Sequence, residues 1–329
     1  MRSIHLAFVL AVMVAATVVA QVTMSGGRSD DPIDDDSRVP VNLGPTINSP
    51  GDEPQVAITH SGLSLYFCSD RPGSFSKLDL WVSHRTSIDA PWGEPRNLGS
   101  MINGPGFQYC PSFSSDDREM FFTSSRPGGF GKLDIYVTRR LDPTDDFGWQ
   151  QPINLGPSIN TSASEADPIY FVDPTTGEAT LYFISNRLGV SNGKGGFLFD
   201  IYQSTRNEDG SFQPAVLNHE LSSPYDDRRE TIRRDGLLLI FTSDRPGGMG
   251  GLDLWVSRRR GTHDPWGVPV NLGAPINSEA DERGSALADD GVTLFFSSDR
   301  PGGYGQGDLW VTTLKRRDRN NGPATPEKN

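Results

Sequence analysis

The stretch Leu65-Tyr66-Phe67-Cys68-Ser69-Asp70-Arg71-Pro72-Gly73, followed from Asp79 by Asp-Leu-Trp-Val, decides the fold of this chain. Two apolar runs separated by a glycine-containing turn are typical of two antiparallel strands in a hairpin. The pattern occurs five times, with its serine at Ser69, Ser124, Ser185, Ser243 and Ser298, spaced by 55, 61, 58 and 55 residues. A repeat of this length indicates one structure assembled from five similar units.

Each unit contains signals for two further strands. A short segment such as Pro54 to Thr59 comes before the hairpin, and a Trp-x-x-Pro-x-Asn-Leu-Gly stretch such as Trp92 to Gly99 comes after it. Four short strands per repeat, without helical periodicity, are typical of a propeller blade. The sequence therefore predicts an all-β fold over residues 38–314: a five-bladed β-propeller with four-stranded antiparallel blades.

The ring is expected to close through its N-terminal end. Residues Val39 to Gly44 match the last strand of the other units, whereas the fifth unit stops at Leu314 without such a strand. We therefore expect the N-terminal strand to pair into the last blade, which removes the exposed edges of an open sheet.

The two ends of the chain suggest export. Residues 1–20 resemble a secretory signal peptide, with Arg2 ahead of an apolar core, and an uncleaved membrane anchor is the alternative. Residues 21–37 are expected to form a disordered acidic linker, and residues 315–329 a disordered tail. We expect a periplasmic or secreted monomer that contacts a membrane only if the signal segment stays uncleaved. A formal charge of -12 argues against a nucleic-acid partner.

The few cysteines and histidines offer no catalytic motif. Cys68 and Cys110 either form one bridge across neighbouring blades or remain two buried thiols. The sequence has no Gly-x-Ser-x-Gly elbow and no His-Glu-x-x-His motif, so a serine hydrolase or a zinc enzyme has no visible machinery.

Residue types present in every unit are expected to serve the blade itself. We predict that an arginine after each marker serine pairs with an aspartate of its own or the adjacent blade, as a structural brace. This structural set comprises Arg71, Asp79, Arg126, Asp134, Arg187, Asp200, Arg245, Asp253, Arg300 and Asp308. Trp92, Trp149 and Trp266 are expected to pack between elements, and an exposed aromatic surface for glycans is the alternative.

Acidic residues gather where each first strand begins, which in a propeller is the mouth of the central channel. The carboxylates are Asp52, Glu53, Glu165, Asp167, Asp226, Asp227, Asp281 and Glu282, whereas the second blade has Phe107 and Gln108 instead. Three interpretations remain open: turn capping within each blade, Ca²⁺ binding and catalysis. Glu53, Asp167, Asp227 and Glu282 are the candidate metal ligands, and Asp52, Glu165, Asp226 and Asp281 are binding candidates.

The third unit departs most from the repeat. Asp173 to Gly177 are inserted in its first hairpin, and Leu188 to Phe199 extend its glycine-rich turn. Insertions on a rigid ring are natural places for binding loops. Lys194 and Phe197 in the extension are therefore further binding candidates.

The repeated Leu-Tyr-Phe-x-Ser-Asp-Arg-Pro-Gly and Asp-Leu-Trp-Val segments resemble the WD40-like repeat of TolB-type propellers. The resemblance covers residues 38–314. It implies a periplasmic scaffold that contacts another envelope protein or a cell-wall polysaccharide, although the extra N-terminal domain of TolB is absent. Five-bladed glycosidases of the arabinanase type are a precedent for acids from separate blades around a sugar.

From these patterns we predict a non-catalytic exported scaffold that requires no cofactor, with Ca²⁺ at the channel mouth as an option. The alternative is a glycan-active hydrolase that uses carboxylates at the channel mouth. The prediction against an enzyme rests on two observations: the acids look like repeats of a single structural motif from which none stands apart, and the motifs of serine hydrolases and zinc enzymes are missing.

Overall fold

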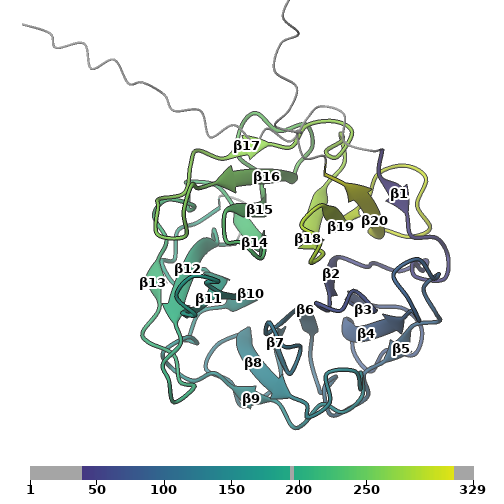
Figure 1. Ribbon diagram of the computed structural model, residues 1–329, viewed down its shortest axis with the longest axis horizontal. Helices are drawn as coiled ribbons and strands as arrows, with labels where there is room; N and C mark the ends of the chain where they lie inside the picture. The colour runs from purple at the N-terminus through teal and green to yellow at the C-terminus, as the bar shows by residue number, and fades with distance from the viewer. Residues whose placement is uncertain (1–38, 193–195, 315–329) are drawn as a thin grey trace, which may run out of the picture. The chain divides into compact units, whose positions relative to one another are not determined.

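The computed structural model describes residues 39–192 and 196–314, except for the side chains of residues 229 and 230. Its regular elements are twenty β-strands arranged as five antiparallel sheets of four strands each. The sheets stand around a central axis like the blades of a propeller (Figure 1). The predicted fold class, a five-bladed all-β propeller, is confirmed.

Each of the first four blades consists of four strands that follow one another in the chain, from the channel outward. Blade 1 contains β2 (Gln55–Ile58), β3 (Ser64–Ser69), β4 (Asp79–His84) and β5 (Arg96–Asn97). Blade 2 contains β6 (Gln108–Phe113), β7 (Glu119–Ser124), β8 (Asp134–Arg139) and β9 (Ile153–Asn154). Blade 3 contains β10 (Glu165–Val172), β11 (Ala179–Ser185), β12 (Asp200–Thr205) and β13 (Val216–Leu217). Blade 4 contains β14 (Asp227–Ile232), β15 (Leu238–Ser243), β16 (Asp253–Arg258) and β17 (Val270–Asn271).

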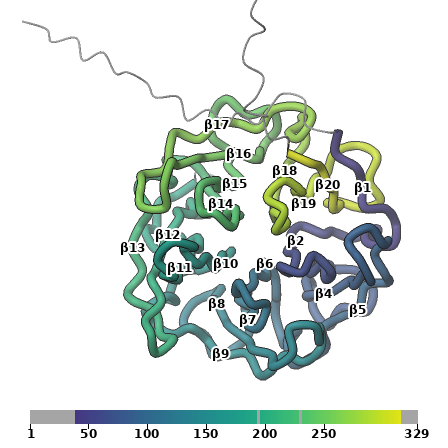
Figure 2. Tube along the Cα trace, in the orientation of Figure 1, coloured from purple at the N-terminus to yellow at the C-terminus, as the bar shows by residue number. Residues whose placement is uncertain are grey.

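Blade 5 is completed by the start of the chain, as the sequence predicts. It contains β18 (Glu282–Leu287), β19 (Thr293–Ser298) and β20 (Asp308–Thr313), with β1 (Val41–Asn42) as its outermost strand. β1 pairs with β20 in the register Val41 to Val311 and Asn42 to Trp310. Figure 2 shows the purple start of the described chain beside its yellow end.

The apolar core lies mainly between neighbouring blades. Tyr66 and Leu80 of blade 1 pack in one buried cluster with Phe113 and Phe122 of blade 2, and similar clusters join the other blades. The middle strands are buried on both faces, which explains their continuous runs of Leu, Tyr and Phe. The ring is therefore stabilised by contacts between blades, which a single blade lacks.

A polar latch explains the repeated Asn-Leu-Gly-x-x-Ile-Asn element. In blade 1, Asn103 pairs with the backbone of Leu80 through two hydrogen bonds of 2.8 and 2.9 Å, and also donates to Asn97. Asn97 in turn donates to Asp79 at 2.8 Å. The same arrangement around Asn42 and Asn48 attaches β1 to β20. The outer strand pairs over only two residues, so these side-chain hydrogen bonds supply much of its attachment to the blade.

The predicted arginine–aspartate braces are wrong in their partners. Asp79 instead accepts backbone N–H groups of Phe75 and Ser76 in the glycine-rich turn, at 2.6 and 3.2 Å. Asp134, Asp253 and Asp308 accept equivalent turn N–H groups in their own blades. Asp200 of blade 3 lies at the start of β12, and its burial together with the charge of Asp227 raises its pKa.

Two further side-chain expectations have definite outcomes. Trp149 and Trp266 are buried, with 3% and 8% of their surface exposed, so packing and not an exposed aromatic surface describes them. Cys68 and Cys110, both within the described range, are buried and do not form a disulfide bond.

The predicted signal peptide, linker and C-terminal tail lie outside the described residues and stay predictions. Within the described residues, no helix is long and apolar enough to cross a bilayer.

Candidate functional site

The arginines that follow the marker serines pair with acids on the innermost strands. Glu53, Glu165, Asp227 and Glu282 each form a salt bridge with the arginine of their own blade, with N–O distances of 3.0, 3.3, 2.6 and 2.9 Å. All four carboxylates are fully buried. Each also accepts hydroxyl groups of its own blade; Ser69, for example, donates to Glu53 at 2.6 Å. These acids therefore brace the blade from within.

This arrangement changes the interpretation of the candidate metal ligands. Glu53, Asp227 and Glu282 are each occupied by their own arginine and serines, in three different blades. Asp167 is not their equivalent, because Glu165 holds that position in blade 3; Asp167 instead accepts the thiol of Cys110. Among the described residues no group of three or more His, Cys, Asp or Glu side chains could hold a metal ion. Ca²⁺ binding stays a prediction without a ligand cluster.

The residue before each buried acid lies at the channel mouth. Asp52 forms an ion pair with Arg283 of blade 5 at 3.3 Å. Burial raises the pKa of Asp52, and this effect outweighs the positive charge of Arg283, which acts to lower it. Asp281 accepts the backbone N–H of Leu252, from blade 4, at 2.9 Å. These contacts join neighbouring blades at the mouth.

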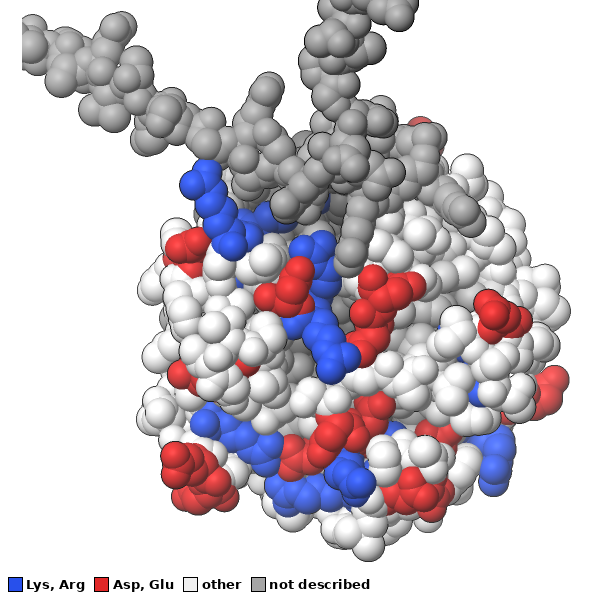
Figure 3. Space-filling view, in the orientation of Figure 1, with Lys and Arg blue, Asp and Glu red and all other residues white. Residues whose placement is uncertain are grey.

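A pocket of about 400 Å³ opens at the mouth, lined by residues of blades 3 and 4 and by Asp281 at the start of blade 5. Three carboxylates line it, those of Asp226, Asp244 and Asp281, together with Arg228 and Tyr225. Figure 3 shows acidic and basic side chains gathered around the centre of the ring on the face in view. The pocket thus combines several hydrogen-bond acceptors with a cationic donor.

Asp226 is the most distinctive residue of this pocket. It is 7% exposed and forms an ion pair with Arg228 through one carboxylate oxygen. Its other oxygen, Oδ1, and the Nε atom of Arg228 are both buried without a hydrogen-bond partner among the described residues. Leaving buried polar atoms unpaired costs about 1–3 kcal/mol each, so such atoms often mark a place where a ligand or water binds.

The extension of the third blade borders the pocket. Ser191, Asn192 and Leu198 line it, whereas Phe197 is not part of the lining and is half-exposed. Lys194 lies outside the described residues. Of the predicted binding residues, the structure brings Asp226 and Asp281 together in this pocket. Asp52 lies elsewhere at the mouth, and Glu165 is buried inside its blade.

Sequence reasoning missed Arg228 and Asp244. The sequence does contain a signal for Arg228. The position that follows the first residue of the inner motif is an arginine only in blades 4 and 5, as Arg228 and Arg283; the other blades have Pro54, Tyr109 and Ala166 there. A positively charged residue that departs from the repeat on the innermost strand is a signal that could have identified Arg228 as a site residue. Asp244 could not be found this way, because aspartate at this position recurs as Asp70 and Asp299.

Comparison with known proteins shows the fold and no family. No family model and no curated protein matches the sequence. An α-L-arabinofuranosidase from Lactobacillus brevis is 15% identical, over 83% of this chain and 92% of that chain, with a TM-score of 0.54. A GH62 hydrolase solved in complex with xylotriose is 11% identical, over 84% of this chain and 97% of that chain, with a TM-score of 0.50.

A putative TolB from Agrobacterium tumefaciens is also among the similar structures. It is 16% identical, over 79% of this chain and 74% of that chain, and its TM-score of 0.44 is too low to carry an argument. TolB-type propellers are therefore one of several groups of proteins whose fold resembles that of this chain.

The prediction that this chain is not an enzyme is contradicted. The similar structures include the α-L-arabinofuranosidase, a GH43_12 protein from a capybara gut metagenome and the GH62 hydrolase. At these identities the likeness shows the fold alone. The prediction treated all the channel acids as repeats of one motif, whereas the structure separates them: Asp227 and Glu282 pair with arginines inside their blades, and Asp226 and Asp281 beside them line one pocket.

Proposed function

We propose that this chain is a glycan-active hydrolase whose substrate binds in the pocket at the channel mouth. The observation that carries the proposal is the buried Oδ1 atom of Asp226, which has no partner among the described residues and lies beside two further carboxylates. Sugar hydroxyl groups are suitable donors for such an oxygen. The similar folds of glycoside hydrolases support the same class of ligand without establishing an activity. The expected export would bring the chain to cell-wall or extracellular polysaccharides.

Hydrolysis of a glycosidic bond commonly uses two carboxyl groups, one as the proton donor and one as the base or nucleophile. We assign the base or nucleophile to Asp226, because Arg228 holds one of its carboxylate oxygens and leaves Oδ1 without a partner among the described residues. We assign the proton donor to Asp281, which lines the same pocket and forms no salt bridge among the described residues. Arg228 then positions Asp226 and offers its remaining N–H donor to the substrate.

The proposal is tested with the purified protein and a panel of plant and bacterial polysaccharides. We expect release of reducing sugar from at least one of them. Asp226→Asn and Asp281→Asn should each lower this activity by about 10²–10⁴-fold, the usual contribution of a general acid or base. Because Asp226 is buried and pairs with Arg228, a thermal melt of each variant must show a folded protein, so that a loss of activity is not a loss of structure.

Asp70→Asn is the matched control. Asp70 caps the N–H of Asp52 at 2.8 Å in blade 1, as Asp244 caps that of Asp226 in blade 4, but it lies outside the pocket. The control should therefore retain activity. No turnover across the panel, or equal activity in Asp226→Asn and the unmodified protein, would overturn the proposal.

A further inference from the structure

Two neighbouring junctions at the channel mouth have the same charged residues but different ion pairs. Blades 4 and 5 each carry an arginine directly after the inner acid, Arg228 and Arg283. In both cases an aspartate lies two residues earlier in the same blade, and another lies at the start of the next blade. Arg228 binds Asp226 of its own blade at 2.5 Å, whereas Arg283 binds Asp52 of the next blade at 3.3 Å. Something other than the charges therefore selects the partner.

The residue before each third strand differs between the two junctions. In every blade its backbone carbonyl accepts the N–H of the inner residue of the next blade, at distances from 2.7 to 3.4 Å. These residues are therefore structurally equivalent, and they are Leu78, Leu133, Phe199, Leu252 and Gly307. Blade 5 has no side chain at a position where the other four blades have a large apolar one.

The absence of a side chain at Gly307 makes room for the ion pair between blades 5 and 1. A Cβ atom at this position would overlap the Oδ1 atom of Asp52 and would lie 2.8 Å from the Nη2 atom of Arg283. These are the two atoms that form the ion pair. Non-bonded heavy atoms pack at about 3.5–4.0 Å, so a leucine at residue 307 would exclude the pair in this geometry. The φ angle of Gly307 is outside the left-handed region, so the backbone itself does not require glycine.

Between blades 4 and 5 the equivalent residue is Leu252. It lines the pocket at the mouth together with Arg228 and Asp281. The carboxylate of Asp281 accepts the backbone N–H of Leu252 at 2.9 Å and forms no salt bridge among the described residues. On the side of blade 3, the guanidinium of Arg228 lies 5.9 Å from the ring centre of Phe199, the equivalent residue of that blade. Arg228 thus has a large apolar residue of this position on both sides.

We propose that Leu252 is a positioning residue for Arg228. Its side chain takes the space that the guanidinium would need in order to reach Asp281, and so it keeps Arg228 on Asp226. The pairing rests on the internal comparison of the two junctions alone. Its consequence for catalysis rests on the proposed function: the carboxyl group of Asp281 stays available to the substrate because no arginine holds it.

A crystal structure of the Leu252→Gly variant near neutral pH tests the pairing directly. We expect Arg228 to leave Asp226 and to bind Asp281, with a nitrogen–oxygen distance below about 4 Å. An Arg228 that still binds Asp226 in this folded variant would overturn the proposal.

The opposite substitution, Gly307→Leu, is a second and independent test. We expect the leucine to displace Arg283 from Asp52, so that Arg283 binds Asp281, two residues earlier in its own blade, as Arg228 binds its own aspartate. An Arg283 that stays within ion-pair distance of Asp52 in this folded variant would also overturn the proposal. The two substitutions are opposite in kind but should bring an arginine to the same carboxylate.

Hydrolysis provides a readout that a merely structural role would not move. Leu252→Gly and Gly307→Leu should each lower the rate on a polysaccharide that the unmodified protein cleaves by about tenfold or more, because a carboxyl group held by a guanidinium is not free to donate its proton. The double variant Gly307→Leu/Arg283→Met should recover the rate, since it keeps the leucine and removes only the guanidinium. A rate that stays low in this double variant would contradict the catalytic consequence.

Leu78→Gly is the matched control. Leu78 is the equivalent residue of blade 1, where the inner acid is followed by Pro54, so no arginine at this position can move. Thermal melts should show similar losses for Leu78→Gly and Leu252→Gly, because both remove one leucine. Only Leu252→Gly should lower the rate of hydrolysis. An equal loss of rate in both variants would assign the effect to stability and contradict the positioning role.

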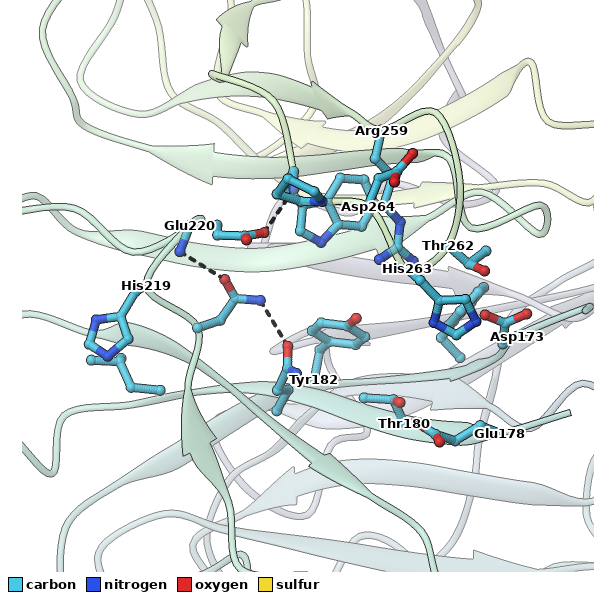
Figure 4. Close-up of a pocket in the computed structure, with 16 residues that line it drawn as sticks. Asp173, Glu178, Thr180, Tyr182, His219, Glu220, Arg259, Thr262, His263 and Asp264 are labelled. Carbon is cyan, nitrogen blue, oxygen red and sulfur yellow. Dashed lines mark hydrogen bonds between the residues drawn. The ribbon is translucent and has the colours of Figure 1, made fainter. Parts of the chain in front are cut away.

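A larger pocket separates the failure of this inference from the failure of the proposed function. It has about 500 Å³, lies between blades 3 and 4 and shares no lining residue with the pocket at the mouth. Figure 4 shows Asp173, Glu178 and Asp264 among the side chains around it. If hydrolysis takes place there, the arginines should move in the crystal structures while the rate stays unchanged. That result would contradict the proposed function and leave the effect of Leu252 on the pairing of Arg228 established.

Discussion

Blade 2 lacks the buried ion pair that the other blades possess. Its inner position is Gln108 instead of an acid, and within the described residues Arg126 has no carboxylate partner. Burial lowers the pKa of Arg126, and the Oε1 atom of Gln108 is buried without a partner in the described part of the chain. The hydroxyl that caps the acid elsewhere is missing as well, because Gly104 stands where blade 1 has Ser49.

Restoring this pair should stabilise the protein. In the Gly104→Ser/Gln108→Glu variant, the new carboxylate would accept hydrogen bonds from the introduced serine, from Ser124 and from Arg126. A Cβ atom at Gly104 has no neighbour closer than 3.9 Å, so the serine fits. We expect a gain of about 1–3 kcal/mol in the free energy of unfolding, typical of hydrogen bonds to a charged group. Urea denaturation at pH 7 measures it.

The single variant Gly104→Ser is the control and should change stability by less than about 0.5 kcal/mol. If the double variant is no more stable than this control, the ion pairs do not brace the blades.

At this scale the sequence named the important residues but not their partners. It identified Arg71 and Asp79 as structural, yet it paired such arginines with such aspartates of the same or the adjacent blade, because both residue types recur in all five units. The true partner, Glu53, was counted as a channel acid. The absence of an acid in blade 2 was visible, but spacing alone does not tell which of two nearby carboxylates an arginine reaches.

At the scale of the elements, β1 has more influence than its two residues suggest. Its pairing with β20, together with the hydrogen bonds of Asn48 to Leu309, completes blade 5. Deleting residues 39–44 from the full chain should expose the backbone of β20 and lower the melting temperature by about 5–15 °C, since several hydrogen bonds are lost. Differential scanning calorimetry measures this change.

Val41→Ala is the matched control for the deletion. The Val41 side chain is 63% exposed, so its truncation keeps the backbone pairing and should leave the melting temperature within about 2 °C. An equal melting temperature for the deletion variant would show that closure contributes nothing to stability.

The elements were the most predictable part of this protein. Turn signals and apolar runs are local features of the sequence. Because they occur in five copies, the strands can be recognised even where one copy differs, such as Phe212 in place of tryptophan in blade 3. The closing strand could be predicted because Val39 to Gly44 copies a recognisable element. The pockets could not be predicted, because they depend on whether a loop of one blade reaches the blade beside it.

At the scale of the whole molecule, ion pairs between blades tie the ring together. Glu119 of blade 2 binds Arg206 of blade 3 through both carboxylate oxygens, at 2.5 and 2.9 Å, and also binds Arg139. Burial acts to raise the pKa of Glu119, but the hydrogen bonds and charge of Arg206 and Arg139 outweigh it, and the pKa is lowered.

The sign of the resulting pH dependence is definite. A carboxyl with a lowered pKa in the folded state stabilises the fold fully above the unfolded-state pKa, which is about 4.3 for glutamate. The stabilisation is lost as the pH falls through the folded-state pKa. Glu119→Gln should therefore lower the free energy of unfolding by about 1–3 kcal/mol at pH 7. Urea denaturation between about pH 7 and 3 should show this difference shrinking below about pH 4.

Glu94→Gln, at an exposed position, is the control and should match the unmodified protein at every pH. A difference between Glu119→Gln and the unmodified protein that stays constant down to about pH 3 would contradict the assignment of this pair.

The closure of blade 5 has a consequence for the order of synthesis. β1 is the first strand of the ring to leave the ribosome, and its partner β20 is the last. The ring therefore stays open, with two unprotected sheet edges, until the whole domain has been made. A chain that ends before β20 lacks the partner of its own first strand, so a truncated product cannot close the ring.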